Sequence, residues 1–363
     1  MARGIRILCA AWTLVLVMAV LGFSPAGAQE LFPLKSGGKI NIVFLAEAYV
    51  ESQKQVFLND ADLAWKTIFD RTPFKENADK FSVHAIWVSS RDSILSEVPG
   101  RTYFGVQPNG SYWEGAIDSL TAVFFPMNRE LTFPYLLVND DISGSGGGLV
   151  NGFHTTIIGT GRLHHEVGYE LFYRYACAHE FGHTFAGLAD EYEGNRIMSL
   201  GGTFDEKEFP NITRETRREF IKWNKFIDPS TPIPTPDADQ YNESMGLFDG
   251  SFVYQRGQGW YRPSRYCLMG NRNNIKDDRI NRFCRVCQDA IEKNIQARLA
   301  IVVSAQKPTP DFNGDGQVDF SDFFLFANVF GEKTKSSNAQ FDLDGDGEIG
   351  FGDFFIFANA FGK

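Results

Sequence analysis

The sequence of 363 residues is poor in cysteine, in histidine and in basic charge. It contains five cysteines and six histidines, and 35 lysines and arginines stand against 45 aspartates and glutamates. Cys284-Arg-Val-Cys287 has no second CxxC pair to complete it, which disfavours a zinc knuckle. The acidic excess is concentrated in residues 311–363, and the rest of the chain is close to neutral. The charge therefore does not indicate a nucleic-acid partner.

Long apolar runs are also lacking, apart from one at the N-terminus. Arg3 and Arg6 precede that run, and the small residues Ala26-Gly27-Ala28 follow it. This pattern is typical of a secretory signal peptide, residues 1–28, cleaved before Gln29. An uncleaved membrane anchor is the alternative. No later stretch is apolar enough to span a bilayer. We therefore expect a mature chain that is secreted or held at the cell surface.

Export changes how the remaining cysteines are interpreted. Four follow the signal peptide: Cys177, Cys267, Cys284 and Cys287. An even number in an oxidising compartment favours disulfides, for which three pairings are possible.

The C-terminal residues 311–363 contain an internal repeat. Segments 311–331 and 342–362 align without gaps and are identical at 13 of 21 positions. Each begins with an acidic loop in which a glycine, Gly316 or Gly347, stands where a calcium loop turns sharply. The first loop offers Asp311, Asn313, Asp315, Gln317 through its carbonyl, Asp319 and Asp322. The second offers Asp342, Asp344, Asp346, Glu348 through its carbonyl and Asp353, with Gly350 in place of an acid.

An aromatic helix follows each loop, and twelve of the 34 phenylalanines lie in this tail, which argues against a disordered segment. The tail resembles dockerin-type repeats, which implies a small α-helical domain, two calcium ions and a protein partner of the cohesin type. Phe320-Ser321 and Phe351-Gly352 depart from the Ser-Thr type at the corresponding positions. Docking to a cohesin, attachment to the cell surface and capping of the chain therefore stay open. Residues 306–310, with two prolines, predict a stiff linker.

The segment HEFGHTFAGLADEY (179–192) predicts a zinc site. On a helix, His179 and His183 project from one face, one turn apart, and Glu180 lies beside the metal. Gly187 can end that helix and turn the chain back. The pattern HExxHxxxGxxD makes Asp190 the expected third ligand and Glu191 the second choice. A more distant glutamate, such as Glu215 or Glu219, is a further alternative.

A set of motifs in consistent order over residues 38–300 resembles the IgA-peptidase family of secreted zinc peptidases. The motifs are INIVFLAEAYV (40–50), PFK (73–75), FSVHAIWVSS (81–90), LLVND (136–140), HEFGHTFAGLADEY, GLFDG (246–250) and YRPSRYCLM (261–269). The resemblance implies a metzincin-like α/β catalytic domain over residues 29–305. It also implies a Met-turn at Met269 beneath a single zinc ion bound by His179, His183 and Asp190.

The hydrophobic pattern agrees with an α/β domain. It predicts strands over 40–45, 81–88 and 135–138 and helices over 51–70, 113–124 and 285–300. Alternating strands and helices favour a twisted mixed sheet with the zinc helix packed on it. Residues from about 195 to 305 are expected to form a less regular lower subdomain.

These features predict a secreted zinc endopeptidase that hydrolyses peptide bonds of protein substrates. Zinc would activate a water molecule, and Glu180 would act as the general base. Tyr261, Arg265 and Tyr266 are candidates for stabilising the oxyanion. The alternative is a non-catalytic, calcium-stabilised binding or surface-attachment protein with a vestigial zinc site.

Overall fold

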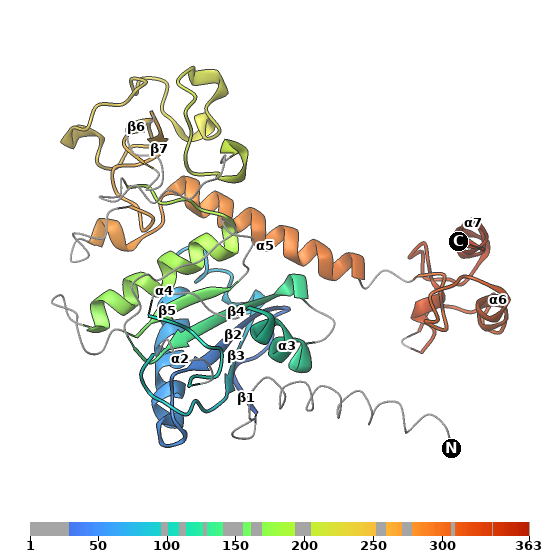
Figure 1. The fold of residues 1–363 in the computed structure, drawn as a ribbon. Coiled ribbons are helices and arrows are strands. Elements are labelled where there is room, and N and C mark those ends of the chain that lie inside the picture. The colour runs from blue at the N-terminus through green and yellow to red at the C-terminus, as the bar shows by residue number, and fades with distance from the viewer. Residues whose placement is uncertain are drawn as a thin grey trace. The chain divides into compact units, whose positions relative to one another are not determined.

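The computed structural model describes the chain from residue 29 to residue 362 with gaps. The described ranges are 29–95, 101–108, 114–125, 129–140, 155–160, 169–192, 205–251, 259–270, 278–305, 309–335 and 337–362. The predicted signal peptide and most of the predicted linker lie outside them. The chain divides into two compact units, Met1–Gln296 and Ala297–Lys363, which are described separately (Figure 1). No helix in the described ranges is long and apolar enough to cross a membrane.

The larger unit is built on a five-stranded mixed sheet. Its strands are β1 (Glu30–Lys35), β2 (Ile40–Glu47), β3 (Phe81–Trp87), β4 (Thr132–Val138) and β5 (Thr156–Gly159), in the spatial order β1-β3-β2-β4-β5. β1 pairs antiparallel with β3, and the other neighbours are parallel. β2 and β4 are buried at every position, as expected for parallel strands covered on both faces. The expected mixed sheet is thus confirmed.

The helices of this unit match the predicted segments closely. They are α2 (Lys54–Phe69), α3 (Glu114–Phe124), α4 (Tyr169–Ala186) and α5 (Arg285–Ala305), the last of which continues past residue 296. Short 3-10 helices lie at Glu51–Gln53, Ala78–Lys80, Arg129–Leu131, Glu206–Glu208, Arg218–Phe220, Asn224–Phe226, Asp239–Tyr241 and Asp278–Asn281. β1 and β5 were not predicted, because the first is a half-exposed edge strand with Pro33 and the second has only four residues.

Aromatic rings fix helix α4 on the sheet. α4 packs against α2 and β5 (Figure 1). The ring of Phe181 lies 5.4 Å from that of Phe74, and Phe185 lies 5.0 Å from Phe133 of β4. The hydroxyl of Tyr135 in β4 donates to the carbonyl of Cys177 at 2.9 Å. Because large aromatic contacts of this kind leave little freedom, the orientation of α4 is set by the core.

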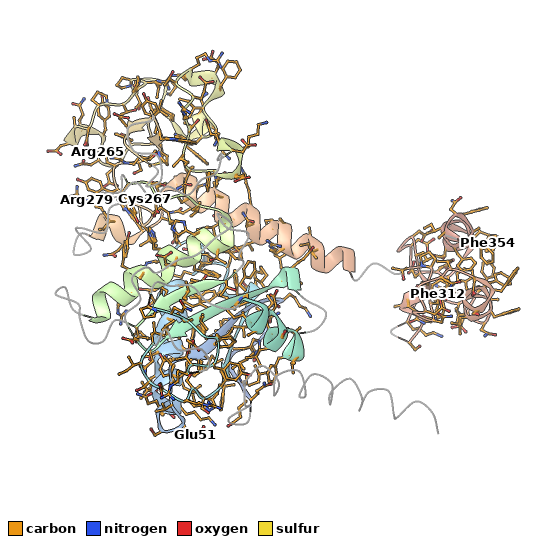
Figure 2. All side chains as sticks on the ribbon, viewed as in Figure 1. Glu51, Arg265, Cys267, Arg279, Phe312 and Phe354 are labelled. Carbon is orange, nitrogen blue, oxygen red and sulfur yellow. The ribbon has the colours of Figure 1, made fainter. Side chains whose placement is uncertain are left out.

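Residues 205–251 and 259–270 have little regular structure, as the sequence predicted. A two-stranded ribbon, β6 (Phe248–Asp249) with β7 (Tyr261–Arg262), accompanies the short 3-10 helices. Trp223 is buried there, and its indole nitrogen donates to the carbonyl of Gly246 at 2.8 Å. Figure 2 shows the side chains that fill this region and the sheet.

The smaller unit contains two similar loop and helix segments. Its helices are α6 (Phe320–Ala327) and α7 (Phe351–Ala360), with a 3-10 turn at Ala339–Phe341. The rings of Phe326 and Phe357 stack at 6.0 Å, and Phe312 stacks on both. The loops are joined where the Gly331 nitrogen donates to the Ile349 carbonyl and the Ile349 nitrogen donates to the Glu332 carbonyl. Phenylalanines from both repeats thus share one small core.

Candidate functional site

Helix α4 brings His179 and His183 together at its C-terminal end. Their Nε2 atoms lie 3.2 Å apart. The Nδ1 atom of His179 lies 2.8 Å from the carbonyl of Leu268, and that of His183 lies 2.5 Å from the carbonyl of Leu188. A carbonyl only accepts, so each Nδ1 carries a proton, and each Nε2 would offer its lone pair to a bound metal. The two lone pairs face the same small space.

Asp190 completes this cluster because the chain reverses after α4. Gly187 adopts a left-handed conformation with φ 61°, and its nitrogen donates to the carbonyl of His183 at 3.0 Å, which ends the helix. The Oδ1 atom of Asp190 then lies 3.1 Å from Nε2 of His179 and 3.4 Å from Nε2 of His183. Ligand atoms around tetrahedral zinc are about 3.3 Å apart when the bonds are about 2.0–2.1 Å. The three atoms therefore fit one zinc ion.

Glu180 lies beside these three atoms. Its Oε2 is 3.9 Å from Nε2 of His183, farther than either contact of Asp190. Glu180, His179 and His183 offer atoms that all lie within 4.8 Å of one another. Glu180 is therefore adjacent to the metal position but is not the best-placed third ligand.

The carboxylates of the cluster stabilise a positive charge between them and the imidazoles. Burial alone would lower the pKa of His183, but the carboxylates of Asp190 and Glu180 outweigh it and raise that pKa to about 9. Burial would likewise raise the pKa of Asp190, but the two imidazoles hold it well below its usual range. A buried set that stabilises a proton in this way also suits a divalent cation.

The backbone around Met269 is hydrogen-bonded to residues in and beside the histidine cluster. The carbonyls of Leu268, Met269 and Gly270 accept, in turn, from Nδ1 of His179, from the nitrogen of Glu191 at 2.7 Å and from the hydroxyl of Tyr175 at 2.9 Å. Met269 is fully buried. A Cβ placed on Gly182, inside HEFGH, would lie 3.0 Å from the Met269 sulfur, so glycine permits this close approach.

Two supporting residues escaped sequence reasoning. The ring of Tyr175 stacks on His179 at 5.2 Å, and its hydroxyl lies 3.2 Å from Nδ1. Asn211 exchanges two hydrogen bonds with the backbone of Ala189, at 2.7 and 2.8 Å, and also donates to Glu191 at 3.0 Å. Tyr175 stands four residues before a histidine, a spacing that hints at contact, but nothing local marked Asn211.

The alternative zinc ligands lie elsewhere. The carboxylate of Glu191 is among three cysteines, and Glu215 pairs with Arg217 at 2.6 Å. Two of the oxyanion candidates have other partners: Arg265 pairs with Asp237 and Asp239, and the guanidinium of Arg279 lies 3.9 Å from the ring centroid of Tyr266. Tyr261 pairs through its backbone with Thr213. The ring of Tyr192 lies 6.4 Å from that of His179.

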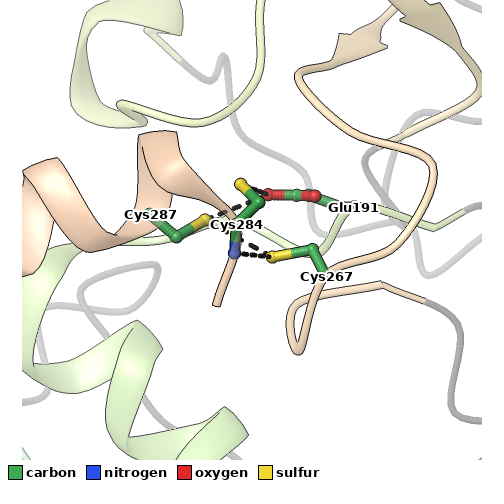
Figure 3. Close-up of side chains that lie close together, drawn as sticks. All are labelled: Glu191, Cys267, Cys284 and Cys287. Atoms are coloured by element: carbon green, nitrogen blue, oxygen red, sulfur yellow. Dashed lines mark hydrogen bonds between the residues drawn. The ribbon is translucent and has the colours of Figure 1, made fainter. Parts of the chain in front are cut away.

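The disulfides expected from the sequence are not found. None of the four cysteines, Cys177, Cys267, Cys284 and Cys287, forms a disulfide within the described residues, and all four are buried. Cys267 and Cys287 come closest, with their sulfurs 3.7 Å apart, whereas a disulfide requires about 2.05 Å. The physical reason is that a carboxylate, that of Glu191, shares their space (Figure 3).

In the second tail loop, Asp342, Asp344 and Asp353 offer oxygens within 4.8 Å of one another. The equivalent trio in the first loop contains Asn313, whose amide oxygen replaces one carboxylate. Gly316 and Gly347 have φ values of 86° and 92°, which confirms the sharp turns predicted there. The remaining proposed calcium ligands, Asp311, Asp315, Gln317, Asp319, Asp322, Asp346 and Glu348, lie in the same two described loops.

Comparison with known families agrees with this geometry. The model of the IgA Peptidase M64 family matches residues 33–243, more than half of the chain and the whole histidine cluster. The chain belongs to the IgA Peptidase M64 family. The Dockerin type I domain model matches residues 309–361. No curated protein matches the chain. Membership of the M64 family implies peptidase activity, and the dockerin match implies calcium binding by the tail. The M64 match ends before Met269 and the three clustered cysteines.

Proposed function

We propose that this M64 protein is an exported zinc endopeptidase that cuts extracellular proteins, with Glu180 as its general base. The convergence of His179 Nε2, His183 Nε2 and Asp190 Oδ1 on one point, with Glu180 beside them, carries the proposal. His179, His183 and Asp190 would hold the zinc. The cysteines that could close the site with a fourth ligand gather around Glu191 instead. Among the described residues, one coordination position is thus left for water or substrate.

Bound zinc would act as a Lewis acid toward water and the peptide carbonyl. The chain's own residues perform the proton transfers. Glu180 takes a proton from the water whose oxygen bonds to the carbonyl carbon, and then delivers it to the leaving nitrogen as the C–N bond breaks. Leu268 and Leu188 hold the two imidazoles by their Nδ1 protons, so the Nε2 lone pairs stay on the metal side.

The dockerin tail would bind two calcium ions and attach the peptidase to a protein partner. Its described surface carries matched exposed aromatic residues in the two repeats: Phe320 with Phe351 and Phe324 with Phe355. Exposed apolar groups of this size are typical of interaction sites. We propose a cohesin-like or cell-surface partner for this face.

Hydrolysis of a broad peptide library by the purified chain tests the catalytic proposal. We expect wild-type activity to disappear with a zinc chelator and to return with added zinc. Glu180→Gln should lower the rate roughly 100- to 10,000-fold while zinc remains bound. Equal inertness of the zinc-loaded wild type and Glu180→Gln would instead support a non-catalytic binding protein. A chain without residues 306–363 should keep its hydrolytic rate, since the tail supplies no residue of the cluster.

A further inference from the structure

A second group of metal-binding side chains lies apart from the histidine cluster. Glu191, Cys267, Cys284 and Cys287 offer one carboxylate oxygen and three sulfurs, all within 4.8 Å of one another (Figure 3). All four residues are buried, with exposed fractions of 6% or less. Three separate segments of the chain supply them. Sequence spacing alone disfavoured such a site, because only two of the cysteines form a CxxC pair.

The hydrogen bonds of this group leave one buried oxygen atom unsatisfied. Oε1 of Glu191 accepts from Asn211, and the Cys287 sulfur lies 3.1 Å away. Its second oxygen, Oε2, is buried and has no hydrogen-bond partner within the described residues. A buried carboxylate oxygen without a partner destabilises the fold unless a cation or a hydrogen-bond donor meets it. The described protein groups therefore leave Oε2 of Glu191 without the cation or donor that its burial calls for.

The distances agree with a tetrahedral zinc ion. Zinc–sulfur bonds of about 2.3 Å place two sulfurs about 3.8 Å apart, and a sulfur and a carboxylate oxygen about 3.6 Å apart. The sulfurs of Cys267 and Cys287 are 3.7 Å apart. Oε1 of Glu191 lies 3.1 Å from the Cys287 sulfur and 3.9 Å from that of Cys284, on either side of the expected value.

Backbone and side-chain donors already surround the proposed ligands. The nitrogen of Cys284 donates to the Cys267 sulfur at 3.3 Å, a contact that stabilises a thiolate. Asn211 orients Glu191.

We propose that Cys267, Cys284, Cys287 and Glu191 bind a second, structural zinc ion. Four protein ligands close its coordination, so this ion takes no part in hydrolysis. It ties together the chain after Asp190, the turn that contains Met269 and the beginning of α5. Those segments carry the carbonyl that holds His179 and the carboxylate nearest both histidines. The second zinc thus positions the catalytic cluster.

Counting zinc on the purified full chain by elemental analysis tests this site. We expect two zinc ions per wild-type chain and one in Cys287→Ser. His183→Ala should also lose one zinc, from the other cluster. Cys177→Ser removes a buried thiol that is outside the group and should keep two. This pattern does not depend on peptidase activity, so failure of the catalytic proposal would leave it intact.

Cobalt replacement provides a second measurement that identifies the ligands. Thiolate-bound cobalt(II) has strong sulfur-to-metal charge-transfer absorption, which nitrogen and oxygen ligands do not produce. The absorption should persist in His183→Ala and disappear in Cys287→Ser. If Cys287→Ser does not fold, titrating wild type with an organomercurial should release one zinc as the thiols react. A wild-type zinc content that Cys287→Ser does not lower, the absence of charge-transfer absorption, or a Cys267–Cys287 disulfide by mass spectrometry would overturn the proposal.

Discussion

Asp190 and Glu191 are neighbours in the chain, yet their carboxylates belong to two different clusters. Oδ1 of Asp190 lies 3.1 Å from Nε2 of His179, and Oε1 of Glu191 lies 3.1 Å from the sulfur of Cys287. The nitrogen of Glu191 is fixed on the carbonyl of Met269, and Asn211 holds the backbone of Ala189. Hydrogen bonds thus fix the backbone at these positions, and the two adjacent side chains reach different clusters.

Replacing each of these two acids by its amide should affect one cluster and leave the other largely unchanged. Asp190→Asn removes a charged oxygen from the histidine cluster, so we expect loss of hydrolysis by at least about 100-fold and weaker binding of one zinc. Glu191→Gln should weaken the other zinc and lower the thermal midpoint, with a smaller change in the rate per zinc-loaded chain. Zinc content, melting and hydrolysis of each variant check this. Loss of the same zinc from both variants would contradict the two-cluster arrangement.

Tyr175→Phe tests how His179 is held. The change removes the hydroxyl that donates to Gly270 and contacts Nδ1, but it keeps the stacked ring. We expect a loss of about 1 kcal/mol in the free energy of unfolding. Because the imidazole becomes freer, the rate constant should fall several-fold with little change in KM. Tyr175→Leu, which also removes the ring, should be clearly worse in both measurements. A Tyr175→Phe chain that matches wild type in both would deny the hydroxyl a role.

Gly182→Ala tests the close contact between α4 and the turn below it. The new Cβ would lie 3.0 Å from the Met269 sulfur and 3.1 Å from the ring of Phe283. We expect destabilisation of about 1–3 kcal/mol, although alanine is otherwise the better helix residue. Gly115→Ala in the first turn of α3 is the control, because that glycine is exposed and the change should stabilise slightly, by less than about 1 kcal/mol. Chemical denaturation measures both; a stabilised Gly182→Ala would be inconsistent with the tight packing.

Gly350→Asp should strengthen the second tail repeat. Asp319 caps α6 by accepting from the nitrogen of Ser321 at 2.7 Å, whereas Gly350, the equivalent residue before α7, has no side chain to do so. A Cβ at Gly350 would meet no atom within 4 Å. We expect about 0.5–2 kcal/mol of added stability without calcium and tighter calcium binding. Calorimetry with and without a chelator checks this, and unchanged melting in both conditions would disprove the cap.

Local sequence was sufficient for much of the site. The spacing of His179 and His183 places both on one helix face, and Gly187, Gly316 and Gly347 mark turns because a left-handed backbone suits glycine. Strands β2, β3 and β4 and helices α2 to α5 were also predictable, since their apolar residues recur with the period of each element. The zinc and calcium ligands themselves stay predictions.

The sequence by itself therefore determined the pattern within each segment, namely the histidine pair, the acidic loops and the apolar strands. Only the tertiary structure separated Asp190 from Glu191, because the direction of each depends on Met269 and Asn211, which lie far along the chain. It also replaced the expected disulfides with a group of three thiols and a carboxylate. Spacing along a sequence limits which side chains share a helix turn or a loop, but packing of distant segments decides which of them meet.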